Sequence, residues 1–345
     1  PEQAVPEFEE LIALTPEQEA DFLKFFRTGR NTHIPDYQRI YSYLSRNFSD
    51  TRFIHSTIPA SRVIETHTGN CMSLALVTAA YAGLAGVEVG WQLANTDPVY
   101  SSEGSVIYSA NHIQTRLYEA AWRTHGNSFS IARDYLLLDY FSDRLPSQGT
   151  ELEQHQVEAL VYQNLGVEAL ADGRLERSFW LLRAGLQHDP RNPNLYNALG
   201  VVHRRAGAAD SAERLYRFAL DRFGDNLLIL RNYRSLLQAQ QRRGEVEAVE
   251  RRILALPDPD PYPVIMLGDE ALDNGRPDRA LAYYEKARKV APYLHEIYWK
   301  MARAHLELGN HRRAELALEK ARENAMVDRD RQLYQAKLHA LANAR

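Results

Sequence analysis

The chain has 345 residues, of which 45% are hydrophobic and 25% charged, and its formal net charge is -4. That length can hold two or three domains with sizeable cores, and a charge so close to balance gives no reason to expect nucleic acid as the main partner. The single cysteine excludes an internal disulfide, and the longest uncharged apolar stretch, residues 71–87, is shorter than the roughly 20 residues of a membrane span.

Helices are predicted to dominate the chain as far as Ala85. Residues 1–14 are acidic and weakly patterned, and we expect a loose lead-in there. Thr15, Pro16 and Gln18 then have the pattern of a helix start, with a capping hydroxyl, a first-turn proline and a glutamine that reaches back to the cap. Three more helices are expected: one after Pro35, one over about 59–66, and one from Met72 to Leu84, directly after a break at Gly69-Asn70.

Alternating patterns then predict an antiparallel sheet. Residues 87–93 and 112–118 alternate as half-buried strands do, and 135–141 is predicted as a third strand. Residues 95–110 are rich in Asn, Asp, Pro, Ser and Gly, so we expect a loop, and we expect a turn at about 125–127. Helices followed by a sheet indicate an α+β domain, which we assign to residues 15–150.

From about residue 157 the sequence repeats itself. Gly173 recurs at Gly207 and Gly275 recurs at Gly309, with the same spacing of about 34 residues in both cases. The pattern resembles the tetratricopeptide repeat, which implies paired helices whose apolar faces are buried by stacking. We therefore expect an all-α solenoid over 157–345 with a final capping helix and five units, at about 159–192, 193–226, a degenerate 227–260, 261–294 and 295–328.

Three residues of the α+β domain have the types that nucleophilic acyl transfer needs. Cys71 opens a predicted helix, where the helix dipole favours a thiolate and unpaired backbone N–H groups can bind an oxyanion. His112 and Asp139 lie on successive predicted strands, which could bring an imidazole beside the thiol and a carboxylate behind it. Each residue alone is more often structural, but their order and spacing together favour a catalytic triad. His67 is a rival base.

At these residues the chain resembles the transglutaminase-like superfamily of cysteine peptidases. The similar segments are Thr68 to Ala75, Asn111-His112-Ile113 and Leu137 to Phe141. The resemblance implies a papain/transglutaminase-like fold with Cys71 as nucleophile, His112 as general base and acid, and Asp139 as the residue that orients His112. Over about residues 11–328 the chain is similar to bacterial members that carry tetratricopeptide repeats. Candidates for the oxyanion-hole side chain of such a site are Asn70, Tyr41 and Tyr43.

The sequence therefore predicts a thiol-dependent peptidase or amide acyltransferase whose repeats hold a protein or peptide substrate. Hydrolysis is preferred to crosslinking because the bacterial members look more like peptidases. The alternative is an inactive transglutaminase-like fold that serves with the repeats as an interaction or assembly scaffold, for example in an envelope polymer system. We expect no cofactor and no metal, since neither a His-Glu-x-x-His motif nor a cysteine pair is present.

The repeats also have a local excess of positive charge. From Arg174 to Arg252 there are 15 arginines, no lysine and 9 acidic residues. A solvated helical face with salt bridges is the ordinary explanation, and a groove for an acidic peptide or polymer is the functional one. The partner-binding candidates are Asn197, Arg204 and Arg205, on the first helix of their unit. Because the sequence begins at Pro1, we expect an exported, periplasmic protein, with a cytoplasmic one as the alternative.

Overall fold

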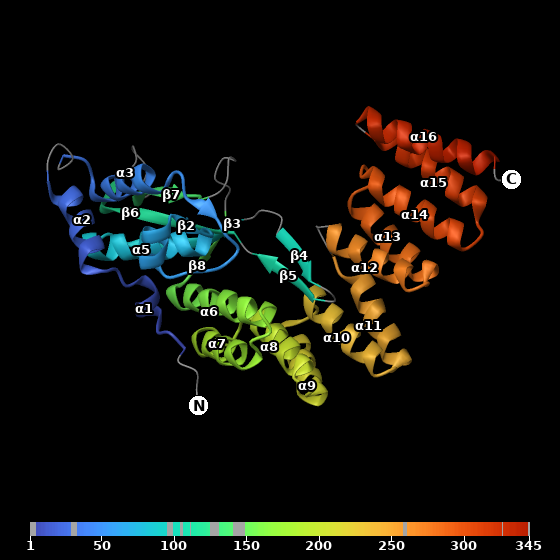
Figure 1. Ribbon diagram of the computed structural model, residues 1–345, viewed down its shortest axis with the longest axis horizontal. Coiled ribbons are helices and arrows are strands. Elements are labelled where there is room, and N and C mark those ends of the chain that lie inside the picture. Colours follow the sequence, from blue (N-terminus) through green and yellow to red (C-terminus); the bar gives the residue numbers. More distant parts are fainter. Residues whose placement is uncertain are drawn as a thin grey trace. The chain divides into compact units, whose positions relative to one another are not determined.

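The computed structural model describes residues 5–28, 33–94, 99–103, 106–110, 112–124, 131–140, 149–257, 261–325 and 327–343 (Figure 1). The chain divides into two compact units, an N-terminal unit, Pro1–Gly224, and a C-terminal unit, Asp225–Arg345.

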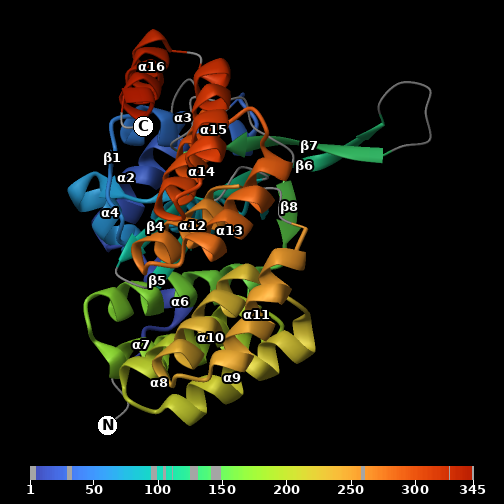
Figure 2. The ribbon, with the colours of Figure 1, turned by 90° about the vertical axis from the view of Figure 1, so that its right-hand side faces the viewer.

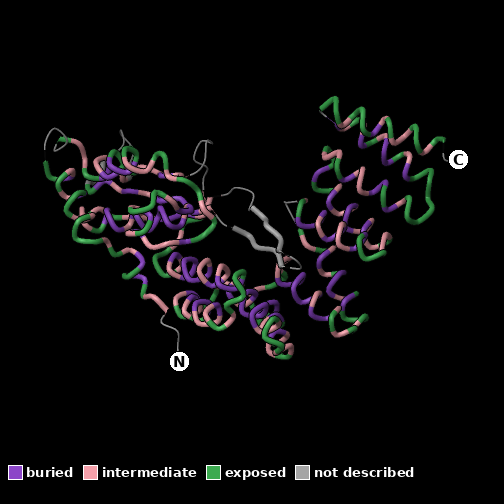
Figure 3. Tube along the Cα trace, in the orientation of Figure 1, coloured by how far each residue is buried: buried purple, intermediate pink, exposed green. Residues whose placement is uncertain are grey.

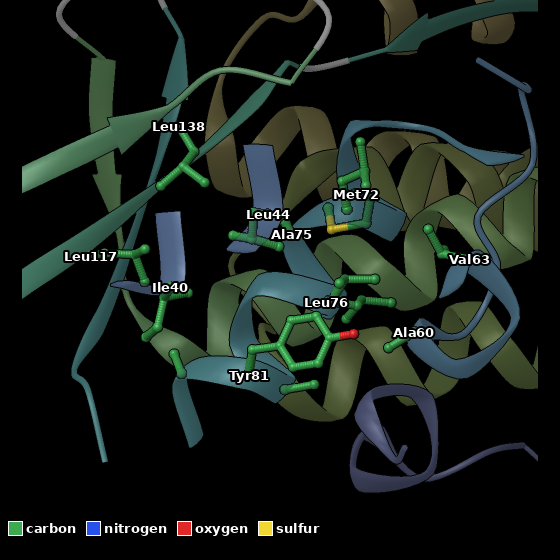
Figure 4. Close-up of a cluster of buried hydrophobic side chains, with 14 of the residues drawn as sticks. Ile40, Leu44, Ala60, Val63, Met72, Ala75, Leu76, Tyr81, Leu117 and Leu138 are labelled. Carbon is green, nitrogen blue, oxygen red and sulfur yellow. The ribbon is translucent and has the colours of Figure 1, made fainter. Parts of the chain in front are cut away.

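The N-terminal unit begins with helices packed around one apolar helix, α5. Thr15 caps α2 as predicted, because the N–H of Gln18 donates to Thr15 Oγ1 at 3.3 Å and the N–H of Thr15 donates to Gln18 Oε1 at 3.0 Å. Ile40 and Leu44 pack near Met72, Ala75 and Leu76 in the same core (Figure 4). The helices are α1 (Phe8–Ile12), α2 (Pro16–Arg27), α3 (Asp36–Phe48), α4 (Ala60–Thr66) and α5 (Cys71–Ala85).

The other side of α5 faces an antiparallel sheet. Its strand order is β7 (Ile131–Leu138), β6 (Ile113–Thr124), β3 (Val89–Ala94) and β8 (Gly149–Leu152). Leu117 and Leu138 of the sheet belong to the core (Figure 4). Strands β6 and β7 continue together past the other strands (Figure 2). The three predicted strands are confirmed, whereas β8 and a short parallel pair, β1 (Arg52–Phe53) with β2 (Thr68–Gly69), were not predicted.

Two local predictions for this unit were wrong. The expected lead-in contains α1, which buries Phe8 and Leu11. The expected loop at 95–110 contains a hairpin of β4 (Val99–Glu103) and β5 (Val106–Ala110), because β-branched and aromatic residues begin both strands and outweigh the polar residues between them. The predicted turn at 125–127 and Phe141 lie outside the described residues.

The first two repeats belong to the same compact unit as the sheet. They consist of α6 (Gln154–Ala171) with α7 (Leu175–His188), and α8 (Pro193–Arg205) with α9 (Ala209–Phe223). Val157, Leu160 and Val161 of α6 are part of the core around α5, and Tyr162 OH donates to the carbonyl of Pro6 at 2.9 Å. The predicted domain boundary at about residues 150–157 is therefore not a boundary between compact units, because α6 completes the core on one side and pairs with α7 on the other.

The C-terminal unit is helical throughout its described residues. Each predicted repeat contains one helical hairpin, and buried residues follow the facing sides of the helices (Figure 3). None of the described helices of the chain is long and apolar enough to cross a membrane. The helices are α10 (Leu227–Ala239), α11 (Arg243–Ala255), α12 (Tyr262–Asp273), α13 (Pro277–Val290), α14 (His295–Glu307), α15 (His311–Asn324) and the predicted capping helix α16 (Asp328–Asn343).

Small residues allow the two helices of a hairpin to approach closely. A Cβ added to Gly200 would lie 2.3 Å from Tyr216 Cε1, and a Cβ added to Gly268 would lie 2.3 Å from Tyr284 Cε1. Each tyrosine ring therefore packs directly on the glycine of the partner helix. These two glycines are two repeat periods apart, and the degenerate repeat between them has Arg234 in the glycine position.

Candidate functional site

Asn70 determines where α5 begins. Its side-chain oxygen accepts the N–H of Ser73 at 2.8 Å, so Cys71 is the first residue of the helix, as predicted. Its Nδ2 donates to the carbonyl of His55 at 3.2 Å and to Thr57 Oγ1 at 3.0 Å. Because both amide hydrogens are committed to the 55–57 loop, Asn70 acts as a helix cap and is not placed to donate to an oxyanion.

The same loop is held by the first repeat. The N–H of Thr57 donates to Glu168 Oε1 of α6 at 2.7 Å. Burial raises the pKa of Glu168 to about 7, and the hydrogen bonds from Thr57 oppose that rise. A continuous hydrogen-bonded path therefore leads from α6 through Thr57 and Asn70 to the start of α5.

The structure brings Cys71, His112 and Asp139 together, as the sequence predicted. The His112 side chain is hydrogen-bonded to Cys71, and its Nε2 is hydrogen-bonded to Asp139 Oδ1. Gln114 Nε2 donates to the other oxygen of Asp139 at 2.7 Å. The hydrogen bond to Cys71 raises the pKa of His112 to about 9, with burial opposing and Asp139 adding to the rise. His112 is therefore protonated at neutral pH.

A second contact ties the same end of β7 to α5. Tyr140 OH is 2.7 Å from Thr78 Oγ1, which itself donates to the carbonyl of Leu74 at 3.0 Å. Burial raises the pKa of Tyr140, so the phenol stays neutral and can donate. Together with the His112 cluster, this contact locks the sheet onto α5 at two points along the helix.

The remaining candidates from the N-terminal half have other partners or are exposed. His67 ends α4 with φ 50°, and its ring stacks on Phe48. Tyr43 OH donates to Asp21 Oδ2 at 2.6 Å, and Tyr41 is exposed.

The three partner-binding candidates all lie on α8. Asn197 is buried and Arg204 is half-buried. Arg205 Nη1 donates to the carbonyl of Leu170 at 2.7 Å, so this guanidinium closes the end of α6. The structure thus gives Arg205 an intramolecular role at the junction of the first two hairpins.

A cluster of charged residues in the C-terminal unit was not predicted from the sequence. Arg234, 1% exposed, donates through Nη2 to Glu270 Oε1 at 2.7 Å and through Nη1 to Tyr283 OH at 3.2 Å. Its Nη1 is also 3.5 Å from Glu250 Oε1, and Glu250 is 2% exposed. An arginine in the glycine position of the repeat was the signal that could have revealed this cluster.

Comparison with known proteins identifies the repeats. Residues 271–338 match the family model of the tetratricopeptide repeat. This part of the chain contains tetratricopeptide repeats. Over 134 residues the chain is 30% identical to the type IV pilus assembly protein PilF of Pseudomonas aeruginosa, and over 105 residues it is 32% identical to protein bimA of Emericella nidulans.

These relatives are matched only in part. The alignments cover 37% of this chain and 52% of PilF, and 30% of this chain and 12% of bimA. The chain therefore spans about half the length of one curated relative and a small part of the other.

Several solved structures are distantly similar. A structure of Pseudomonas aeruginosa PilF has 22% identity, covers 56% of this chain and 90% of that chain, and has a TM-score of 0.39. A MamA protein has 18% identity, covers 48% and 91%, and has a TM-score of 0.35. YrrB, described as a tetratricopeptide protein with an unusual peptide-binding site, has 18% identity, covers 52% and 92%, and has a TM-score of 0.33.

The prediction that the chain is a cysteine peptidase or amide acyltransferase is wrong. The family model that matches describes a repeat and not a peptidase. PilF, the relative that is matched over 52% of its length, is an assembly protein and not a peptidase. Three polar side chains at a helix start and two strand ends can lock a sheet onto a helix as well as they can transfer a proton. Their order and spacing therefore do not distinguish the two roles.

Proposed function

We propose that the chain is a non-enzymatic scaffold that binds a protein partner through its tetratricopeptide hairpins during assembly of an envelope polymer. The observation that carries the proposal is the similarity of 134 residues to a pilus assembly protein, together with the match of residues 271–338 to the repeat family. In stacked helical hairpins, the first helices of the successive hairpins form a long surface that can bind a partner. Substitutions on that surface leave the core unchanged.

In this proposal the N-terminal α+β part is a transglutaminase-like fold that serves as a binding module. The contacts of Cys71, His112 and Asp139 support a structural role, because they close the sheet over α5 beside the capped helix start. The cluster then maintains the shape of the module. The proposed location is the cell envelope, by similarity to PilF.

The test is complementation and partner capture in the source organism with the full chain. Cys71→Ala should restore assembly and capture the same partner as the wild type, because no covalent step is involved and Asp139 keeps its contacts with His112 and Gln114. Gly268→Ala should lose both, because its Cβ would meet the ring of Tyr284 and misplace α12 against α13.

A matched control separates repeat packing from helix propensity. Gly244→Ala on α11 adds the same methyl group where, apart from its chain neighbours and the backbone of its own helix, no atom of the described residues lies within 4 Å. This variant should behave as the wild type does. If Cys71→Ala abolished assembly while its unfolding transition stayed unchanged, the scaffold proposal would be overturned.

A further inference from the structure

The third hairpin, α10 with α11, has a strained turn between its helices. In the other four hairpins a glycine with positive φ occupies this turn, whereas the third hairpin has Gln241 at the same place in the repeat, with φ 59°. A residue with a Cβ adopts this conformation at a cost in free energy, because its Cβ comes close to the following carbonyl oxygen. The Gln241 side chain is exposed, so its packing does not offset this strain. The four glycines are Gly173, Gly207, Gly275 and Gly309, with φ between 67° and 79°.

The same hairpin has a charged helix crossing. In the hairpins before and after it a tyrosine ring packs on a glycine, whereas α10 and α11 meet at this place through Arg234 and Glu250. Nε of Arg234, and Nε and Nη1 of Arg231 on the same helix, are buried without a hydrogen-bond partner among the described residues. Burying unsatisfied donors of a charged group is strongly unfavourable. The crossing of the third hairpin therefore contributes less to stability than an apolar crossing does.

The third hairpin also has little support from other hairpins of its own unit. It begins the C-terminal unit, which starts at Asp225. Within this unit α11 packs against α13 of the fourth hairpin, whereas the fourth hairpin packs against both the third and the fifth. The stability of stacked hairpins is approximately the sum of the stability of each hairpin and of its interfaces with its neighbours. Low intrinsic stability and a single interface within the unit therefore occur in the same hairpin.

We propose that the third hairpin is a local-unfolding element, which opens as one segment while the fourth and fifth hairpins stay folded. Folded proteins open in contiguous segments whose free energies of opening differ, and a segment with strain and poorly compensated buried charge has a low one. In chain order α10 is the third of five first helices, so its opening divides this series of helices into two shorter ones. The hairpin is therefore a conformational switch within the repeats.

Hydrogen exchange of the full chain, followed by mass spectrometry under native conditions, tests this proposal. After correction for intrinsic exchange rates, the amides of α10 and α11 should exchange together. They should exchange at least about tenfold faster than the amides of α12 and α13. Equal protection of the two hairpins would overturn the proposal.

Two substitutions of Gln241 separate the backbone strain from the loss of the side chain. Gln241→Gly relieves the strain of the positive φ and should slow the exchange of α10 and α11 about threefold to tenfold. Gln241→Ala removes the side chain beyond Cβ but keeps the strain, so it should change the exchange rates by about twofold at most. If both variants slowed the exchange equally, the turn would not be strained and the proposal would be contradicted.

The reverse substitution tests whether the strained turn weakens a regular hairpin. Gly275→Gln introduces the turn residue of the third hairpin into the fourth, at φ 67°. Apart from chain neighbours, no atom of the described residues lies within 4 Å of the added Cβ. The exchange of α12 and α13 should become about threefold to tenfold faster because of the backbone strain alone. Unchanged exchange of this hairpin would count against the proposal.

A further variant tests the charged crossing. Arg231→Met removes the buried donors that lack a described partner and should slow the exchange of α10 and α11. Faster exchange would mean that the buried charge supports the hairpin, which the proposal excludes. All these measurements use the chain without a partner, whereas the scaffold proposal is tested by partner capture. Failure of the one is therefore distinguishable from failure of the other.

Discussion

Arg234 and Glu250 form a buried ion pair in the place where neighbouring hairpins pack a tyrosine ring on a glycine. Their Nη1 and Oε1 atoms are 3.5 Å apart. Arg234 lies one repeat period from Gly200 and one from Gly268, and Glu250 lies one period from Tyr216 and one from Tyr284. The degenerate repeat therefore keeps the helical hairpin but replaces its apolar crossing with charges.

Removing one partner of this pair should lower the free energy of unfolding more than replacing both partners by the glycine and tyrosine of the neighbouring repeats. Glu250→Ala leaves Arg234 with Glu270 as its remaining described carboxylate and opens a gap beside a buried guanidinium, so it should cost about 2–3 kcal/mol of unfolding free energy. The double variant Arg234→Gly with Glu250→Tyr restores the arrangement of the neighbouring repeats and should recover most of that loss. Urea denaturation of the full chain measures both values, and an equal loss in the single and double variants would contradict the expectation.

Adding a methyl group at a helix crossing should be destabilising. Gly200→Ala places a Cβ 2.3 Å from the ring of Tyr216, and such overpacking costs about 1–3 kcal/mol. Gly244→Ala has open space around it and should instead gain up to about 1 kcal/mol from helix propensity. Opposite shifts in Tm are expected, and shifts of the same sign would count against the close approach of α8 and α9.

The carboxyl group of Glu168 should make stability fall as pH rises. Burial raises its pKa in the folded chain to about 7 from 4.5, so its neutral form is favoured by folding. The stabilisation is complete below about pH 4.5 and is lost as pH rises through about 7, an effect of about 2 kcal/mol after allowance for partial exposure. Unfolding free energies of the wild type and Glu168→Gln across this window should diverge with pH in favour of the variant. If the difference in unfolding free energy between the wild type and Glu168→Gln did not change with pH, Glu168 would not be the cause of the pH dependence.

His112 should show a pH dependence at higher pH. Its pKa is raised from 6.5 to about 9, so its contribution is fully present below about pH 6.5 and disappears as pH rises through about 9. We expect His112→Gln to lose about 1–2 kcal/mol relative to the wild type at pH 6 and much less above pH 9. Denaturant titrations at the two pH values measure the difference. If the loss were the same at both, His112 would not hold its proton for Cys71 and Asp139.

Local signals explain why much of the fold could be predicted. The cap at Thr15, the break before Cys71 and the regular spacing of glycines each depend on neighbouring residues or on a repeat. The hairpin of β4 and β5 has weaker local signals, and the strand β8 has only 4 residues. The domain boundary depends on which side of α6 is covered, and Val157 and Leu160 fit a repeat core and a sheet core equally well.

For the candidate sites too, one part could be predicted from the sequence and another part could not. The meeting of Cys71, His112 and Asp139 followed from a helix start and two strands, whereas their role did not follow from their spacing. The sequence alone assigns Arg234 to a charged surface, because it is a strong cation in an arginine-rich segment. The repeat register shows Arg234 in a glycine position, but its ion pairs with Glu250 and Glu270 depend on helices that are distant in sequence.

The hydrogen-bonded path from Glu168 through Thr57 and Asn70 limits where the chain can be truncated without loss of core contacts. A fragment that ends at residue 150 would lack Val157, Leu160 and Val161 from its core and the carboxylate that anchors the 55–57 loop. The compact unit that contains the α+β part does not end there but extends to Gly224. The first two hairpins therefore belong to the same compact unit as the sheet, and α6 adds residues to its core, although they are also the beginning of the repeats.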